Sequence, residues 1–352
     1  MATIAQAIRM ALHKGETELG VQDIFGEDVG APLGGVFTCT QGLEKAWNTP
    51  LDERGIIGMA IGLAMADQKP VAEIQFCDYI FNTIDLLKIA GNTLWTSAGQ
   101  FPLAMVIMTP VGTGIHGSIY HSHSFDSIAT HIPGMKVVLT SNPKDTYGLL
   151  ISAIKDPNPV LFMYPKALIR AQGEEKIPGE PEDSKQLSAM IDAPVGDRKS
   201  WKPDWPKLED FEIPLGKSKT CVEGRDLTVI SYGRTLPLCV SAAKECLDQH
   251  GYSIEVIDVR TLIPLDEQAL YDSVNKTGRV LVVNEDTEMT NFGEHILRKI
   301  SEHCFYSLKA APKLLAGANT PGIGLAWTLE SVQVPQKKSI QDAMIQLCQT
   351  QA

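Results

Sequence analysis

The sequence predicts an α/β protein with two doubly wound, mostly parallel-sheet domains. Short runs rich in Val, Ile and Leu alternate with longer segments of helical periodicity, and this alternation occurs before residue 171 and again after residue 214. Parallel strands need long crossovers that are usually helical, so each series is typical of a doubly wound sheet. Residues 171–214 between them are polar, Pro-containing and weakly periodic. We therefore expect domains at 1–170 and 215–352, with a linker or surface insertion at 171–214.

The first series begins with an amphipathic helix at residues 3–14, whose apolar side chains recur at helical spacing. Strands and helices of ordinary length then follow. The expected strands are 21–25, 71–76, 103–109, 136–140 and 160–164. The expected helices are one that contains the apolar run 56–66, and those at 81–94 and 144–155.

The helix around residues 56–66 organises this domain. Asp52 is a plausible N-cap after Pro50, and Glu53 then lies in the first turn, where the helix dipole stabilises a carboxylate. The following run has almost no polar side chains, so we expect the helix to be buried on nearly all sides. Small residues recur every four positions, which suits tight packing within the chain or against another subunit. They are Gly58, Gly62 and Ala66.

The second series contains three strands that alternate with three helices. The strands are expected at 227–232, 254–259 and 279–283, and the helices at 236–249, 266–275 and 292–303. In the polar segment between the two series, Trp201 and Trp205 are the side chains best suited to hold the segment against the body of the protein.

Composition limits the classes of function. The chain has 352 residues and a formal net charge of −11, which argues against a nucleic-acid or anionic-membrane surface as its main partner. Its seven cysteines contain no CxxC pair, as expected for reduced thiols. No apolar run reaches membrane-spanning length and no signal peptide is evident. We expect a cytoplasmic protein, or one of the mitochondrial matrix if the chain is processed.

Several polar side chains follow strand ends, where doubly wound sheets bind ligands. Glu27 comes after the first strand and a glycine, and Gln75 and Tyr79 come at or just after the next strand. These three residues could converge with Glu53 and His121 on one crevice. The alternatives are ordinary packing at a helix start for Tyr79 and a solvated or sheet-edge amide for Gln75.

Half of the eight histidines lie in one short window, at positions 116, 121, 123 and 131. A polar loop, a metal site and a catalytic loop are all open interpretations. No Cys, Asp or Glu stands at a recognised metal-ligand spacing. His121 is flanked by the hydroxyls of Tyr120 and Ser122, which could orient a ring proton, so a catalytic loop is the better interpretation.

The same window contains Gly112, Gly114 and Gly117 in a GxGxxG pattern. A dinucleotide site would require a strand, the glycines and then a clean helix, followed by a second strand ending in an acidic residue. Neither the helix nor the acidic residue is found. A nicotinamide-binding function is therefore a minor alternative.

The motifs together resemble a known family. The segments are Phe25-Gly-Glu-Asp-Val-Gly30, Asn48-Thr-Pro-Leu-Asp-Glu53, Ala72-Glu-Ile-Gln-Phe-Cys-Asp-Tyr-Ile-Phe81, Tyr120-His-Ser122, Asp156-Pro-Asn-Pro159, Val256-Ile-Asp-Val-Arg-Thr-Leu-Ile-Pro264 and Lys276-Thr-Gly-Arg279. They are similar to the beta subunit of the thiamine-diphosphate-dependent 2-oxo acid dehydrogenases. The resemblance covers nearly the whole chain except 171–214. It implies a transketolase-like pyrimidine-binding domain followed by a transketolase C-terminal domain.

The resemblance also implies roles for individual residues. Glu53 matches the glutamate that hydrogen-bonds N1′ of the cofactor's aminopyrimidine ring, and Tyr79 matches the aromatic residue that stacks on this ring. Gln75, Leu51 and Glu27 match other cofactor neighbours. A buried carboxylate at position 53 would suit proton exchange with the ring.

Two further implications concern acyl transfer and metals. His121 matches the histidine that assists acyl transfer to a lipoyl group. A potassium site is implied at Leu103, Met105, Val106, Ala153, Asp156 and Asn158. The Gly-Asp-Gly motif that holds Mg²⁺ and diphosphate in thiamine enzymes is missing, since Gly196-Asp197 is followed by Arg198.

The chain therefore resembles half of an active site. Its implied partners are an alpha subunit that holds Mg²⁺ in an α₂β₂ heterotetramer, a lipoyl acyltransferase core and a 2-oxo acid substrate. The motif at residues 73–79 is closer to the branched-chain type than to the pyruvate type, while Met108 and His123 depart from residues common in the family. An acetoin dehydrogenase beta subunit and a non-catalytic subunit of the same fold remain alternatives.

Overall fold

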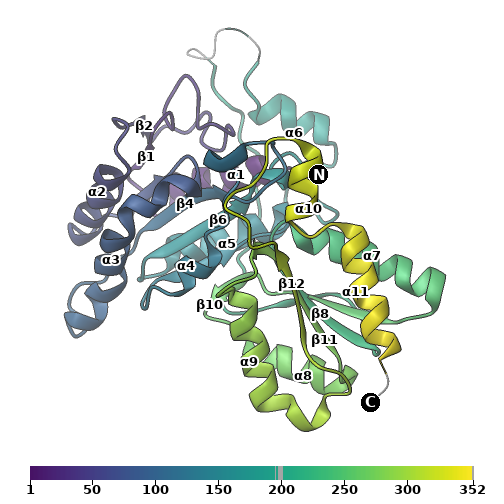
Figure 1. Cartoon of the computed structure of the whole chain (residues 1–352). Coiled ribbons are helices and arrows are strands. Elements are labelled where there is room, and N and C mark those ends of the chain that lie inside the picture. Colours follow the sequence, from purple (N-terminus) through teal and green to yellow (C-terminus); the bar gives the residue numbers. More distant parts are fainter. Residues whose placement is uncertain (195, 197–200, 351–352) are drawn as a thin grey trace. The chain divides into compact units, whose positions relative to one another are not determined.

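The structure is a computed structural model that describes residues 1–194, 196 and 201–350 (Figure 1). The contacts within the chain divide it into two compact units. The first comprises residues 1–110 and 129–215, and the second comprises residues 111–128 and the chain from residue 216 onward. Asp197 and Arg198, which follow Gly196 in place of a complete Gly-Asp-Gly motif, lie outside the described residues.

The first unit contains a parallel sheet, in which neighbouring strands follow the order β5-β6-β4-β3-β1-β2. Its strands are β1 (Ile24–Gly26), β2 (Ala46–Asn48), β3 (Val71–Glu73), β4 (Val106–Val111), β5 (Lys136–Leu139) and β6 (Val160–Pro165). The predicted parallel sheet is confirmed. The short strand β2 was not expected, because its three residues are only partly buried and carry no alternating pattern.

Helices cover this sheet. They are α1 (Ile4–Glu18), α2 (Glu53–Met65), α3 (Ile84–Thr96), α5 (Pro143–Lys155) and α6 (Ser184–Ile191), with 3₁₀ turns at Cys77–Thr83 and Lys166–Leu168. The short helix α4 (Asp126–Thr130) begins in the second unit and ends in the first. Helix α1 begins with a capping box between Thr3 and Gln6. Its apolar face is fully buried and packs on α5, where Gly15 lies close to Ile154.

Helix α2 is not buried on nearly all sides, as the sequence suggested. Ile56, Ile57, Ala60, Ile61 and Ala64 are buried, but Gly58, Gly62 and Ala66 are exposed. A methyl group added at Gly58 or Gly62 would meet no atom within 4 Å. The small-residue flank of α2 therefore does not pack against other described residues of this chain. Packing within the chain does not explain why this flank is apolar.

Residues 171–214, expected to form a linker or surface insertion, lie in the first unit and contain helix α6. The Trp205 ring stacks on His13 of α1, with centroids 4.2 Å apart and planes 9° apart. The Tyr147 and Phe211 rings also stack, at 6.4 Å. The expectation that a tryptophan holds this segment to the body is confirmed for Trp205.

The second unit contains a five-stranded sheet of order β12-β11-β8-β9-β7. The strands are β7 (Lys219–Val222), β8 (Leu227–Ser231), β9 (Ile254–Asp258), β11 (Val280–Thr287) and β12 (Lys313–Gly317), with the short β10 (Thr261–Ile263) following β9. All pairings are parallel except the antiparallel edge strand β7. The second doubly wound sheet is therefore confirmed.

Its helices are α7 (Thr235–His250), α8 (Glu267–Thr277), α9 (Phe292–Cys304), α10 (Trp327–Gln333) and α11 (Lys337–Gln349), with 3₁₀ turns at Ser118–Tyr120 and Phe305–Ser307. The three predicted helices correspond to α7, α8 and α9. No helix in the described parts of either unit is long and apolar enough to cross a bilayer. All seven cysteines are free thiols.

Candidate functional site

The carboxyl ends of β1 and β3 bring two predicted residues together. These strands are parallel neighbours with Gly26 opposite Glu73, so the segments after them leave from the same edge of the sheet. The Gln75 side-chain amide donates hydrogen bonds to the main-chain oxygen of Glu27 and to the Asp28 carboxylate, both at 3.2 Å. The Gln75 amide is therefore hydrogen-bonded to the segment that follows β1.

Glu53 lies in the first turn of α2, as predicted, and accepts a hydrogen bond from the Asn82 amide at 3.3 Å. Asp52 is the N-cap residue but makes no side-chain capping bond. Glu53 is half-buried and is not the buried carboxylate that was expected from the sequence. The reason is the one-sided burial of α2, which leaves its first turn partly open.

Electrostatic coupling joins Glu53 to Glu27 and Tyr79. Burial raises the pKa of Glu27, and the negative charges of Asp28 and Glu53 raise it further. The pKa of Tyr79 is raised by burial, then by Asp78, Glu27 and Glu53. We call Glu27, Glu53, Gln75 and Tyr79 the acid cluster. Leu51, two residues before α2, is 71% exposed.

The acid cluster is negatively charged, and α2 provides little positive charge to balance it. The adjacent cation, Arg54, forms a two-pronged ion pair with Asp85, at 2.6 and 2.9 Å. A fork–fork pair of this kind occupies the guanidinium. The cluster offers carboxylates, an amide and a phenol, which suit a neutral or protonated heterocycle better than a phosphate group.

Glu73 was not singled out from the sequence as a functional group. It ends β3, is 3% exposed, and accepts a hydrogen bond from the Tyr164 hydroxyl at 3.2 Å. Burial raises its pKa to about 7, and the bond from Tyr164 opposes this shift. The available signal was a carboxylate inside an apolar strand, which is costly to bury in its charged form.

His121 belongs to the second unit, together with the rest of loop 111–128. It follows the 3₁₀ turn Ser118–Tyr120, and its Nδ1 lies 3.3 Å from the main-chain oxygen of Gly117. The predicted convergence of His121 with the acid cluster of the first unit stays a prediction. Within the described residues, no group of three or more His, Cys, Asp or Glu side chains could hold a metal ion.

The glycine pattern in this loop does not form a dinucleotide cradle. The Thr113 main-chain N–H donates to Glu285 at 3.3 Å, and the Gly114 N–H donates to Glu330 at 2.9 Å. A pyrophosphate site needs free amides at the start of a helix. Here these two amides are bonded to carboxylates, and only a three-residue 3₁₀ turn follows.

The residues of the implied potassium site lie on two adjacent segments of the first unit. The carbonyl of Met105 accepts from Val160 N at 3.0 Å, and the carbonyl of Ala153 accepts from Asp156 N at 3.3 Å. The Asp156 carboxylate forms an ion pair with Lys136 and accepts two hydrogen bonds from Asn158. A cation here would therefore rely on carbonyl oxygens with a remaining lone pair.

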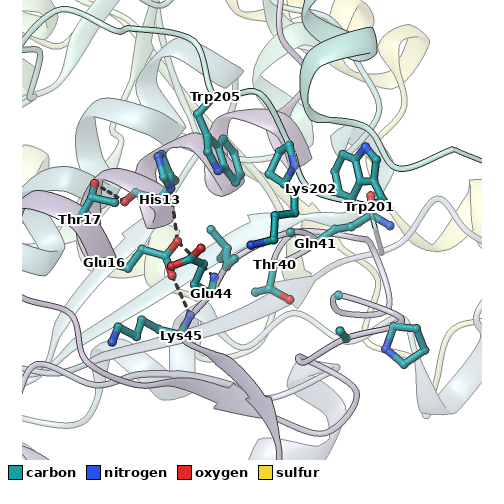
Figure 2. Close-up of a pocket in the computed structure, with 16 residues that line it drawn as sticks. His13, Glu16, Thr17, Thr40, Gln41, Glu44, Lys45, Trp201, Lys202 and Trp205 are labelled. Atoms are coloured by element: carbon teal, nitrogen blue, oxygen red, sulfur yellow. Dashed lines mark hydrogen bonds and ion pairs between the residues drawn. The ribbon is translucent and has the colours of Figure 1, made fainter. Parts of the chain in front are cut away.

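A separate cavity of about 440 Å³ lies in the first unit between α1, residues 31–45 and residues 201–205. Figure 2 shows Trp201, Lys202 and Trp205 along one side of it. The carboxylate of Glu16 accepts from the main-chain N–H groups of Glu44 and Lys45, at 3.3 and 2.9 Å. No member of the acid cluster lines this cavity.

Comparisons with known proteins identify two family domains in the chain. The transketolase pyrimidine-binding domain matches residues 1–172, and the transketolase C-terminal domain matches residues 216–340. A solved split-gene transketolase, described as an inactive beta4 tetramer, covers 100% of both chains with a TM-score of 0.70 at 17% identity. This likeness concerns the fold.

Sequence relatives are more similar. The 2-oxoisovalerate dehydrogenase subunit beta of Bacillus subtilis is 36% identical over 93% of this chain and 92% of its own. The mitochondrial subunit of the same name from Dictyostelium discoideum is 38% identical over 85% of this chain and 74% of its own. The pyruvate dehydrogenase E1 component subunit beta of Acholeplasma laidlawii is 36% identical over 90% and 88%.

Proposed function

Since this chain belongs to the family of 2-oxo acid dehydrogenase beta subunits, with their transketolase pyrimidine-binding and C-terminal domains, we propose that it forms half of a thiamine-diphosphate active site. The enzyme would decarboxylate a 2-oxo acid and transfer the acyl group to a lipoyl protein. The observation that carries this proposal is the acid cluster, which lies within the part matched by the pyrimidine-binding domain.

The acid cluster suits the pyrimidine half of the cofactor. When bound, thiamine diphosphate supplies a thiazolium ring that accepts the electron pair released as carbon dioxide leaves. Glu53 would hold a proton at N1′ of the pyrimidine, and Tyr79 would cover the ring with its aromatic face. Gln75 is fixed by its two hydrogen bonds, and Glu27 and Leu51 would complete the contacts.

The charge of the acid cluster supports a second subunit at the other half of the cofactor. Carboxylates repel a diphosphate, and the Arg54 guanidinium is held by Asp85. An alpha subunit would therefore supply Mg²⁺ and the diphosphate ligands. The exposed flank of α2, with Gly58 and Gly62, supports close packing of another subunit in an α₂β₂ assembly. The C-terminal domain would contact the lipoyl acyltransferase core.

We favour a branched-chain 2-oxo acid as substrate, because the motif at residues 73–79 is closer to the branched-chain type. Pyruvate is next, because relatives with both names match at similar identity. Acetoin dehydrogenase chemistry is the alternative within the family. Relatives from bacteria and mitochondria are consistent with a place in the cytoplasm or the mitochondrial matrix. A panel of 2-oxo acids and acetoin, assayed with the chain and its co-expressed alpha subunit, tests the choice.

The decisive variant is Glu53→Gln in the reconstituted complex. We expect decarboxylation, followed with an artificial electron acceptor, to fall by roughly 10²- to 10⁴-fold, the usual contribution of an acid–base group. Thermal unfolding should be unchanged, because Glu53 is half-buried. The exposed Glu44, replaced by Gln, is the matched control. Near-normal turnover of Glu53→Gln would remove this residue from the mechanism.

Cofactor binding tests the half-site. Thiamine diphosphate should bind weakly to the purified chain alone and tightly after the alpha subunit is added, as titration calorimetry can measure. Size-exclusion chromatography should show the assembly at the same time. Tight binding by this chain without its partner would refute the division of the site.

His121 is proposed to act after decarboxylation, in acyl transfer to the lipoyl group. We expect His121→Ala to reduce acylation of a lipoyl domain more than it reduces decarboxylation measured with the artificial acceptor. Equal losses in the two assays would contradict this role.

A potassium ion is also proposed near Leu103, Met105, Val106, Ala153, Asp156 and Asn158, held by carbonyl oxygens since the Asp156 carboxylate is paired with Lys136. Thermal unfolding of the chain in potassium chloride and in sodium chloride of equal ionic strength tests it. Equal midpoints in the two salts would argue against a specific site.

A further inference from the structure

Loop 111–128 is fastened to the rest of the second unit by carboxylates that come from β11 and α10. Glu285 accepts hydrogen bonds from the Thr113 main-chain N–H at 3.3 Å and from the Thr113 hydroxyl at 3.0 Å. Glu330 accepts the Gly114 N–H at 2.9 Å. These acids are 172 and 216 residues from their partners in the sequence. We call Glu285 and Glu330 the carboxylate anchors.

Glu330 is buried and Glu285 is mostly buried, so the partners of both carboxylates are important. Glu330 is 1% exposed and the side chain of Glu285 is 9% exposed. A buried carboxylate is strongly destabilising unless hydrogen bonds or opposite charges compensate it. The Arg234 guanidinium lies 3.7 Å from the Glu285 carboxylate. The N–H and O–H groups of the loop provide the hydrogen bonds described for both carboxylates. The anchors and the loop therefore stabilise each other.

The loop needs this support, because its backbone is strained. His116 and Ser118 have φ values of 56° and 57°, a region that residues other than glycine rarely adopt. Such conformations persist where the surroundings impose them. Glu330 also faces His116, with its Oε2 3.6 Å from the ring Nδ1. One buried acid thus contacts the loop at two points, Gly114 and His116.

The strained segment leads directly to His121. The His121 ring Nδ1 lies 3.3 Å from the Gly117 oxygen, and a methyl group on Gly117 would lie only 2.5 Å from the His121 Cβ. The position of His121 therefore depends on that of Gly117. The position of Gly117 in turn depends on the anchored residues 113–116. A shift of the anchored segment would move the imidazole.

We propose that Glu285 and Glu330 are positioning residues that hold loop 111–128 in the shape that presents His121 for acyl transfer. The inference rests on the proposed role of His121. It assigns no contact with substrate or cofactor to the two acids. Their effect passes through the loop, so it should appear in acyl transfer and be nearly absent from decarboxylation.

The experiment uses the complex reconstituted with the alpha subunit. We expect Glu330→Ala and Glu285→Ala to reduce acylation of a lipoyl domain by roughly 10- to 100-fold, the range for a misplaced group, while decarboxylation with an artificial acceptor changes little. Glu330→Gln should be intermediate, because its amide oxygen still accepts from Gly114 while its NH₂ would face His116. Glu288→Gln, an exposed acid of the same segment, is the control.

Hydrogen exchange provides the second readout. Amides of residues 112–117 should exchange faster in Glu330→Ala than in the unaltered complex, with Glu330→Gln closer to the unaltered complex. If His121→Ala impairs acyl transfer but both alanine variants at the anchors do not, the positioning role is overturned. If His121→Ala itself spares acyl transfer, the proposed role of His121 fails, and unchanged exchange in Glu330→Ala would overturn the anchoring as well.

Discussion

The acid cluster of the first unit and the carboxylate anchors of the second unit use the same chemical group in opposite surroundings. Glu53 is half-buried, and the hydrogen bond described for its carboxylate comes from one side-chain amide, Asn82. Glu330 is buried, Glu285 is mostly buried, and both accept main-chain N–H groups. A carboxylate that exchanges a proton needs an oxygen lone pair that is available to accept it. A carboxylate that fixes a backbone segment needs hydrogen-bond donors in fixed positions. The number and kind of donors thus fit the two proposed roles.

Glu73 sharpens the comparison, because it is buried like the anchors but lies in the first unit. Its pKa is raised to about 7 from the model-compound value of 4.5. The folded state therefore binds this proton more tightly than the unfolded state. The resulting stabilisation is full below about pH 4.5 and is lost as the pH rises through about 7, a change on the order of 3 kcal/mol.

We accordingly expect the free energy of unfolding of the first unit to decline between pH 5 and pH 8. Glu73→Gln, which is permanently neutral, should flatten this decline, as urea unfolding at several pH values can measure. A slope that is the same in both proteins would mean that Glu73 is charged in the folded state and belongs with the anchors in its behaviour.

The second prediction disturbs the carboxylate anchors by a substitution at a glycine, with both carboxylates left in place. Gly112 has φ of 83°, and a Cβ there would lie 1.9 Å from Glu285 Oε1. Gly112→Ala should destabilise the second unit by about 1–3 kcal/mol and lower acyl transfer. Gly251→Ala is the matched control, since its φ is 74° but its Cβ would meet nothing within 4 Å. Thermal unfolding should rank Gly112→Ala as the less stable protein; the reverse order would refute the close contact.

The third prediction compares a tyrosine from each region. Tyr232 donates its hydroxyl to the Asp126 carboxylate at 2.7 Å, and Asp126 is 2% exposed. Burial and the nearby Asp286 raise the pKa of Asp126. Tyr232→Phe should destabilise the protein by about 1–3 kcal/mol, because a buried acceptor loses its donor.

Tyr79→Phe in the half-buried acid cluster should change stability by less than about 0.5 kcal/mol, since water can replace its hydroxyl. Chemical denaturation of both variants checks the pair. Equal losses of stability at the two positions would contradict the proposed difference between the regions.

The last prediction concerns the exposed flank of α2. Gly62→Ala should leave the isolated chain equally stable or more stable by up to about 1 kcal/mol, because alanine favours helix and space is available. Gly62→Trp should spare the isolated chain and prevent assembly with the alpha subunit, as size-exclusion chromatography can show. Normal assembly of Gly62→Trp would place the subunit contact elsewhere.

Local patterns in the sequence were sufficient for much of the fold. The alternation of strands and helices predicted both parallel sheets, and Pro50, Asp52 and Glu53 predicted the start of α2. These features depend on neighbours in the chain, through backbone geometry and periodic burial. The edge strands β2 and β7 escaped prediction, because short, partly exposed strands have neither a period nor a continuous apolar run.

The sequence by itself determined the family, the two α/β domains and the residues of the acid cluster, because each is encoded by contiguous motifs. Tertiary structure alone decided which side of α2 is open, that Trp205 and Phe211 pack on the first unit, and that Glu285 and Glu330 hold the loop of His121. Those outcomes depend on groups that are far apart in the chain. Their interaction energies arise only when folding brings donor and acceptor within hydrogen-bonding distance and removes water from both.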